Sequence, residues 1–301
     1  MAVKVIDIHT HVIPRRGFLR PDGETVATAA ELVQIMDRCG IDQMVALPLT
    51  SPETLHFVQS NEEAFEACDQ FPGRFIKFCN VDPRHENNSP EHDFTRVLDY
   101  YKGLGAKGLG ELTSNLWWDD PRVQQLLLGC QEVGFPVIFH VAVREFRIYG
   151  LITEPGLGGL ERALAKFPRL QLVGHSQGFW SEVGPVSETE RGGYPKGKVL
   201  PGGAVPRLLR RYPNLSGDLS AGSGFNAVSR DPDWGYRFME EFQDRLCFGL
   251  DICAPSNETP LVDFMRAAAA TGKISPAAHQ KIMGGNAAKL LKLEEKRKES
   301  P

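Results

Sequence analysis

Two histidines, His9 and His11, close an apolar run that begins at Val5 and is typical of a buried strand. Because side chains alternate between the two faces of a strand, these two imidazoles point the same way. Two imidazoles a few ångströms apart on one face suit a divalent metal ion. The pair alone is equally compatible with one buried core histidine beside an exposed one, so the rest of the chain has to decide.

Four further residues that could bind a metal or move protons also stand at the ends of predicted strands. They are Glu111, His140, His175 and Asp251. In a barrel of parallel strands the active site lies at the C-terminal strand ends, so we expect all six side chains to gather there. A shared cation would satisfy polar groups that are costly to bury unpaired. The other histidines fall in predicted helices or polar loops, where solvation is the rule: His56, His85, His92 and His279.

The strands that would position these residues alternate with helices along the chain. Strands are predicted over 4–11, 42–48, 74–81, 106–112, 136–141, 170–175, 215–219 and 245–251. Helices are predicted over 25–38, 61–70, 90–102, 121–133, 157–167, 205–212, 234–244, 260–271, 275–283 and 286–293. This rhythm implies right-handed parallel βαβ units, and eight of them fit an α/β fold of the (β/α)8 TIM barrel type. An open doubly wound sheet is the alternative.

Composition limits the class of protein. The 301 residues, 42% of them hydrophobic, can form one large core, and we predict a single domain over 1–293 with a charged tail over 294–301. The net charge of −4 and scattered basic residues argue against nucleic acid as a partner. No apolar stretch approaches the roughly 20 residues that span a membrane, and no signal peptide is recognisable. We therefore expect a cytoplasmic enzyme with a small-molecule substrate. A second copy of the chain, in a homo-oligomer, is the other partner that we consider.

Five stretches resemble the amidohydrolase superfamily of metal-dependent enzymes, and within it the amidohydrolase-related branch. They are Ile6-Asp7-Ile8-His9-Thr10-His11, Phe139-His140, Gly174-His175, Phe248-Gly249-Leu250-Asp251 and Gly284-Gly285-Asn286-Ala287-Ala288-Lys289-Leu290-Leu291. The resemblance implies a distorted barrel and a catalytic divalent ion, most often zinc, with manganese as the alternative. It implies that the ion is bound by His9, His11, His140 and Asp251, and that His175 lies beside it as an acid/base or polarising residue.

The residue types support catalysis with an activated water. Neutral imidazoles and one carboxylate leave an open metal position, and zinc lowers the pKa of a water bound there to about 7. Asp251 could accept a proton and pass it to a leaving group, and His175 could stabilise or protonate the developing oxyanion. We predict a hydrolase of a lactone, amide or related bond in a small substrate with a carboxylate or carbonyl. A helix cap for Asp251 and a ligand support for His175 are the alternative roles.

Other functions remain open within and outside the branch. The branch includes non-oxidative decarboxylases of unsaturated or aromatic acids, although 175–179 departs from the glycine-rich stretch usual in them. A metal-dependent nuclease resembling the TatD family is a second alternative, against which the acidic net charge weighs. A non-catalytic metal-binding scaffold is the alternative from a different class, and a complete set of metal ligands argues against it.

Glu111 leaves the number of metal ions open. In superfamily members with two ions, the fourth strand supplies a carboxylated lysine or a glutamate that bridges them. Glu111 could thus bind a second ion, bind substrate, or pair with Lys107 or Arg144. One ion is expected, with two as the alternative.

The remaining candidates concern the substrate. Arg144, just after the fifth strand, could bind a substrate carboxylate. The long segment 176–203 exceeds an ordinary strand–helix connection, and we hypothesise that it forms a lid with Phe179 and Trp180 over the pocket. Alternatively, the segment is a surface loop without a role at the site, or it contacts another copy of the chain in an oligomer. Near the end of the seventh strand, Asp218 or Ser220 could orient substrate or a metal ligand, and Cys253 could line the pocket.

Overall fold

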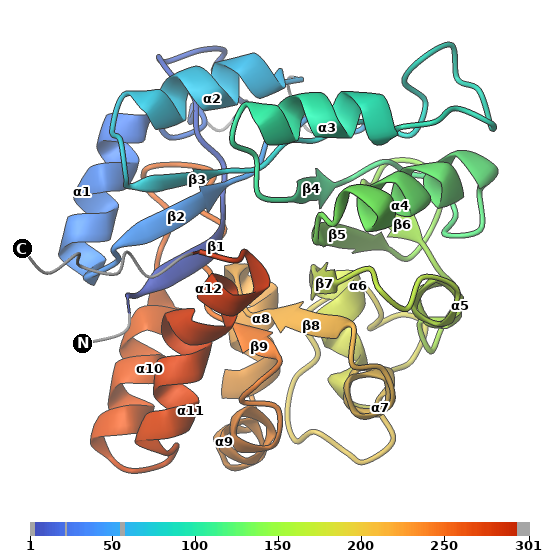
Figure 1. Ribbon diagram of the computed structural model, residues 1–301. Coiled ribbons are helices and arrows are strands. Elements are labelled where there is room, and N and C mark those ends of the chain that lie inside the picture. The colour runs from blue at the N-terminus through green and yellow to red at the C-terminus, as the bar shows by residue number, and fades with distance from the viewer. Residues whose placement is uncertain (1–3, 22, 55–57, 294–301) are drawn as a thin grey trace, which may run out of the picture.

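The computed structural model describes residues 4–21, 23–54 and 58–293 (Figure 1). The predicted charged tail at 294–301 and His56 lie outside these described residues.

The described strands all pair in parallel. They are β1 (Ile6–Thr10), β2 (Gln43–Ala46), β3 (Phe75–Lys77), β4 (Leu109–Leu112), β5 (Val137–Ala142), β6 (Leu151–Ile152), β7 (Leu172–His175), β8 (Leu215–Asp218) and β9 (Leu246–Cys247). Each of the eight predicted strands is present, and most are shorter than predicted. The additional strand, β6, has two residues and pairs with β5. Two residues are too few to produce a periodic pattern in a sequence.

The strands belong to two sheets that together make the wall of the barrel. One sheet has the order β1-β2-β3, and the other contains the path β4-β5-β7-β8-β9. Backbone hydrogen bonds link the edges of the two sheets, from Cys79 N to Gly108 O (3.0 Å) on one side and from Ile8 N to Phe248 O (2.9 Å) on the other. Figure 1 shows the strands at the centre with helices around them. The predicted (β/α)8 barrel is thus confirmed.

Helices follow most of the strands and cover the outside. They are α1 (Ala29–Cys39), α2 (Asn61–Asp69), α3 (Thr95–Gly103), α4 (Pro121–Val133), α5 (Gly158–Lys166), α6 (Gln177–Trp180), α7 (Ala204–Arg211), α8 (Ala221–Ser229), α9 (Pro232–Glu241), α10 (Pro260–Ala270), α11 (Pro276–Gln280) and α12 (Asn286–Leu290), with short turns η1 (Ser181–Val183) and η2 (Lys281–Gly285). The sequence predicted neither α6 nor α8. Within the described residues, no helix is both long and apolar enough to cross a membrane.

Helix α1 illustrates how local sequence sets these elements. Thr28 and Glu31 form a capping box, in which each side chain accepts a hydrogen bond from the other residue's backbone N–H. Leu32 and Met36, four residues apart, bury one face against the barrel. Gly40 ends the helix with φ at 65°, a left-handed conformation that glycine adopts without strain.

The core has two layers. The larger one lies between the strands and the surrounding helices. The smaller one fills the barrel and includes Ile8, Phe78 and Val173, with Ala287 and Leu291 from α12 and its C-terminal cap packed against it. This apolar interior fixes the strands, so that polar side chains at their C-terminal ends are held on a rigid frame.

The segment after β7 is held against the barrel by a buried ion pair. Glu182 Oε1 accepts a hydrogen bond from Arg191 Nε at 2.7 Å, and both side chains are buried. Arg191 Nη2 also donates to the backbone oxygen of Thr153 (2.7 Å), and Glu182 Oε2 accepts from Gly156 N (2.8 Å). These bonds set the path of the chain toward Tyr194, which reaches the candidate site.

Candidate active site

The six predicted site residues come together where the strands end. His9 belongs to β1 and His11 follows it, Glu111 belongs to β4, and the other three lie in β5, in β7 and after β9. Asp251 has a left-handed backbone with φ at 56°, which is uncommon for a residue with a side chain. Its N–H donates to the backbone oxygen of His9 (2.9 Å), so β1 holds the strained turn in place.

His9, His11 and Asp251 form a first triad of possible metal ligands. The Oδ1 atom of Asp251 lies 3.5 Å from His9 Nε2 and 3.4 Å from His11 Nε2. All three donor atoms lie within 4.8 Å of one another. The strand alternation that put the two histidines on one face is therefore confirmed.

Glu111, His140 and His175 form a second triad. Glu111 Oε1 lies 2.7 Å from His140 Nδ1 and 3.8 Å from His175 Nε2. The other carboxylate oxygen, Oε2, faces the first triad, at 3.7 Å from His9 Nε2 and 3.6 Å from His11 Nε2. Glu111 belongs to the second triad and also faces the first, with one carboxylate oxygen toward the histidines of each.

The ring nitrogens that face away from the centre are fixed by hydrogen bonds. His11 Nδ1 donates to the backbone oxygen of Leu47 (2.9 Å), which leaves the lone pair of its neutral ring on Nε2. His9 Nδ1 donates to Asp218 Oδ2 (2.7 Å), and His175 Nδ1 bonds the hydroxyl of Ser220 (2.9 Å). Such partners orient a metal-binding imidazole and raise its basicity.

The donor set fits a divalent metal ion. His9 Nε2 is buried and has no hydrogen-bond partner among the described residues, which is costly unless another group satisfies it. Imidazole nitrogens and carboxylate oxygens are the ligands of catalytic zinc sites. The side chains of the two triads are therefore compatible with a metal site.

Electrostatics in the centre favour ionised carboxyl groups. Burial raises the pKa of Asp251, but His9 and hydrogen bonds from His11 and His175 outweigh burial and bring the pKa below its usual range. Burial opposes ionisation of Glu111 as well, and His140 and His9 outweigh it, so its pKa falls well below the ordinary value. Two negative charges, one of them buried, among imidazoles suit a cation.

Asp7 is a site residue that sequence reasoning missed. Its Oδ1 accepts hydrogen bonds from the backbone of His9 (2.9 Å) and of Leu250 (3.0 Å). The carboxyl is fully buried, and burial raises its pKa to about 8. Asp7 therefore connects β1 to the residue just before Asp251. In the sequence, the position of Asp7 in the first strand is the only sign of this role.

Phe179 and Trp180 do not lie over the pocket as predicted, although Gln177 and Tyr194 of the same segment line the cavity described below. Phe179 and Trp180 are buried, because Gly174 and Gly217 have no side chain and leave room for the two rings. Trp180 Nε1 donates to the backbone oxygen of Asp218 (2.7 Å). The two aromatics therefore pack behind β7 and β8 and support the site from the core.

The other two predicted substrate contacts also take different places. Arg144 is exposed, and its backbone oxygen accepts a hydrogen bond from Asn115 (3.2 Å). It is not among the residues that line the cavity beside Asp251. Ser220 is fully buried and binds His175 and Asp218, so it orients the site and does not face the cavity.

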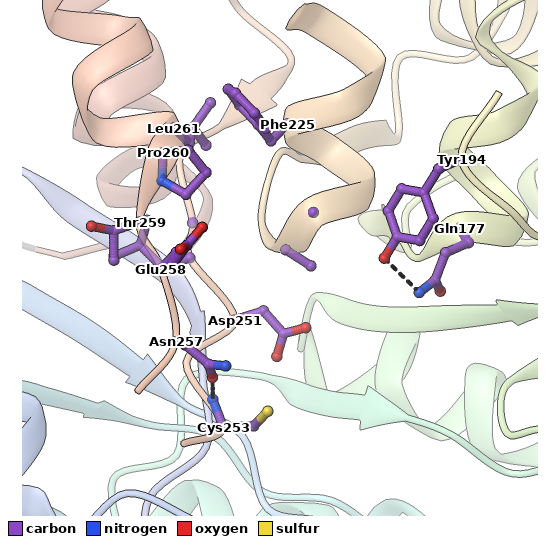
Figure 2. Close-up of a pocket in the computed structure, with 14 residues that line it drawn as sticks. Gln177, Tyr194, Phe225, Asp251, Cys253, Asn257, Glu258, Thr259, Pro260 and Leu261 are labelled. Carbon is purple, nitrogen blue, oxygen red and sulfur yellow. Dashed lines mark hydrogen bonds between the residues drawn. The ribbon is translucent and has the colours of Figure 1, made fainter. Parts of the chain in front are cut away.

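A cavity of about 360 Å³ opens beside Asp251 (Figure 2). Its walls include Cys253, as the sequence suggested, and residues from segments far apart in the chain, namely Gln177, Tyr194, Phe225, Asn257 and Glu258. Tyr194 and Asn257 lie in irregular loops, where no periodic pattern marks them. Of the six predicted site residues, Asp251 is the one that lines the cavity.

Comparisons with known proteins agree with this geometry. The sequence model of a family described as Amidohydrolase matches residues 6–293. No curated protein matches the chain by sequence.

Three solved structures share the fold. An uncharacterised TIM-barrel protein of Bordetella bronchiseptica is 21% identical with a TM-score of 0.64, over 96% of this chain and 99% of that one. A probable 2-pyrone-4,6-dicarboxylic acid hydrolase of Acinetobacter baumannii is 14% identical (TM-score 0.58, coverage 96% and 99%). A 2,6-dihydroxybenzoate decarboxylase from Rhizobium is 16% identical (TM-score 0.55, coverage 98% and 100%).

Proposed function

The chain belongs to the amidohydrolase family, and we propose that it is a metal-dependent hydrolase of a lactone, amide or related bond in a small molecule. The observation that carries this proposal is the convergence of two triads of metal-binding side chains, with Glu111 between them, beside a cavity. A non-catalytic scaffold would need neither the cavity nor side chains held ready on both sides of Glu111.

The donor atoms indicate which residues would hold metal. The sequence led us to expect one ion, but because the two triads are separate we propose that two could be held. His9, His11 and Asp251 would hold one ion, and Glu111, through Oε1, would hold another with His140 and His175. A single ion bound by His9, His11, His140 and Asp251 is the alternative. We propose zinc, because neutral imidazoles with carboxylates are its usual catalytic ligands. When bound, such an ion supplies Lewis acidity and lowers the pKa of a water.

Asp251 is suited to move the proton that hydrolysis releases. Its side chain is 22% exposed, whereas those of His9, His11 and Glu111 are at most 5% exposed. Its Oδ1 faces the first triad and its Oδ2 lies 3.5 Å from His175 Nε2. Asp251 can therefore take a proton from the attacking water and pass it to the leaving group at the cavity wall.

His175 favours the decarboxylase as a second candidate function. Asp218 Oδ2 lies 3.2 Å from its Nδ1, and this contact stabilises the protonated imidazole. In the single-ion alternative, in which His175 holds no metal, a protonated His175 could deliver its proton from Nε2 to a carbanion that forms when carbon dioxide leaves. In a hydrolase the same proton would stabilise an oxyanion.

Turnover of matched substrates tests the proposal. Zinc-loaded enzyme would be assayed with aryl lactones and anilides, and with hydroxybenzoic acids, in water enriched in ¹⁸O. We expect ¹⁸O in the carboxyl product of a lactone or anilide and loss of turnover in Asp251→Asn, with His85→Ala, on an exposed loop, as the control. Release of carbon dioxide from the acids without ¹⁸O in a cleaved bond would favour the decarboxylase. No turnover of either class would contradict both functions.

A further inference from the structure

The cavity beside Asp251 has an unusual charge distribution for an enzyme of small carboxylated molecules. Its described lining contains no lysine, arginine or histidine, and its formal charges are Asp251 and the exposed Glu258. Arg20 contacts the thiol of Cys253 at 3.8 Å but is not among the lining residues. A carboxylate placed here would meet the negative charges of Asp251 and Glu258, and no lining residue would supply a cation.

The cavity instead offers neutral hydrogen-bond donors from opposite walls. The hydroxyl oxygen of Tyr194 accepts a hydrogen bond from Gln177 Nε2 (3.1 Å), so its own proton is available to donate. Asn257 Oδ1 accepts from the backbone N–H groups of Cys253 (2.9 Å) and Ala254 (2.8 Å). Because both of these hydrogen bonds are accepted by the side-chain oxygen, the NH₂ group of Asn257 is available to donate a hydrogen bond to a ligand.

Figure 2 shows how these groups lie around Asp251. Tyr194 and Gln177 stand on one side, and Asn257, Glu258 and Thr259 stand on the other. Phe225 and Leu261 add apolar surface to the wall. Gly222 leaves room for the tyrosine ring, since a Cβ atom there would lie 3.3 Å from Tyr194 Cε1. The volume of about 360 Å³ lies within the usual range for small-ligand pockets.

We propose that this cavity is a substrate subsite for an uncharged cyclic group that carries a hydrogen-bond acceptor, such as a carbonyl or carboxamide oxygen. Tyr194 and Asn257 donate to the acceptor, and Glu258 discriminates against a carboxylate. The proposal rests on the proposed function, because the reacting bond must lie at the metal-binding side chains. The expected substrates were small molecules with a carboxylate or a carbonyl. The subsite restricts them to molecules whose group farthest from the reacting bond is uncharged.

Hydroxamic acids separate the subsite from the metal centre. Acetohydroxamic acid binds metal through its head group and has no distal ring. The compounds 4-carbamoyl- and 4-carboxybenzohydroxamic acid share the head group and a ring, and differ in the charge of the distal group. Titration calorimetry with zinc-loaded enzyme would give the dissociation constant of each. We expect the carbamoyl compound to bind at least about 10-fold more tightly than the carboxy compound.

Three variants assign that difference to residues. Glu258→Lys should bring the two affinities to within about 3-fold by adding the missing cation, and Glu91→Lys, the same charge change outside the cavity lining, should leave the ratio unchanged. Tyr194→Phe should lower the affinity for the carbamoyl compound about 5-fold, because one hydrogen bond is lost. The affinity for acetohydroxamic acid should not change.

The outcomes distinguish the subsite from the metal centre. Equal or tighter binding of the carboxy compound, or a Tyr194→Phe variant with unchanged carbamoyl affinity, would overturn the subsite while acetohydroxamic acid still binds. Failure of all three compounds to bind would overturn the metal centre, and the subsite that depends on it.

Discussion

The Oδ2 atom of Asp218 lies 2.7 Å from Nδ1 of His9 and connects this ligand to the second triad. The same oxygen lies 3.2 Å from His175 Nδ1 and accepts a hydrogen bond from the hydroxyl of Ser220 (2.9 Å). Asp218 is fully buried, and although burial raises its pKa, His9 and His175 outweigh burial and lower it. One ionised carboxylate therefore orients a histidine in each triad.

Replacing Asp218 with asparagine should weaken metal binding. Both carboxylate oxygens accept hydrogen bonds, Oδ1 from Ser220 N and Oδ2 from His9, whereas an amide has one acceptor atom. In either orientation of the amide, one donor would face an NH₂ group. We expect Asp218→Asn to lower zinc affinity about 10–100-fold, measured by competition with a chelating dye. Asp263→Asn, on an exposed helix face, is the control, and unchanged affinity in Asp218→Asn would show that His9 needs no such support.

We expect Glu111 to determine how many ions the centre binds. Because its two oxygens face different triads, elemental analysis should find about two ions per chain of the wild type and about one in Glu111→Ala. His85→Ala should retain the wild-type number, since that side chain is exposed. A wild type with one ion that Glu111→Ala keeps would support the single-ion alternative and assign Glu111 to substrate or proton transfer.

The thiols should report the integrity of the fold. Cys253 is half-buried at the cavity, whereas the other five cysteines are buried, and burial raises the pKa of Cys68 and Cys247 to about 12. Burial and the nearby charge of Asp251 raise the pKa of Cys253 as well, so its thiol should react slowly. Because it is the most accessible of the six, a disulfide reagent at pH 8 should modify about one thiol in the native protein and six in denaturant. Cys253→Ser should abolish the native reaction. Rapid modification of several native thiols would contradict the packing described for these strands and helices.

The convergence of the candidate metal-binding side chains could be predicted because it depends on local rules. Alternation along β1 places His9 and His11 on one face, and the ends of parallel strands meet at one end of a barrel. Asp251 was predicted for the same reason, although its left-handed backbone leaves no mark in the sequence. Asp218 was recognised only as one of two candidates, because its partners come from other strands.

Apart from Asp251 and Cys253, the residues that line the cavity could not be predicted, because their positions depend on tertiary contacts. Phe179 and Trp180 follow β7 at the catalytic end, yet the space left by Gly174 and Gly217 draws both rings into the core. Tyr194 reaches the cavity through an irregular segment whose path is set by packing against the loop near Thr153. Sequence distance from a strand end does not indicate which way such a side chain points.

The ion pair between Glu182 and Arg191 should be a main determinant of stability for that segment. Arg191→Met would leave the Glu182 carboxylate buried without its cation, which costs about 3–5 kcal/mol in the free energy of unfolding. The double variant Glu182→Gln/Arg191→Met should recover part of this loss, because no unpaired charge stays buried. Urea denaturation of the purified variants measures both effects.

Arg207 supplies the matched comparison for this pair. It forms an ion pair with Glu161 at 2.7 Å, but its side chain is 46% exposed and water screens the interaction. We expect Arg207→Met to cost less than about 1 kcal/mol. Equal losses for Arg191→Met and Arg207→Met would show that the buried pair does not anchor the segment. A larger loss at Arg191, together with weaker binding of 4-carbamoylbenzohydroxamic acid, would show that the pair also positions Tyr194 at the cavity.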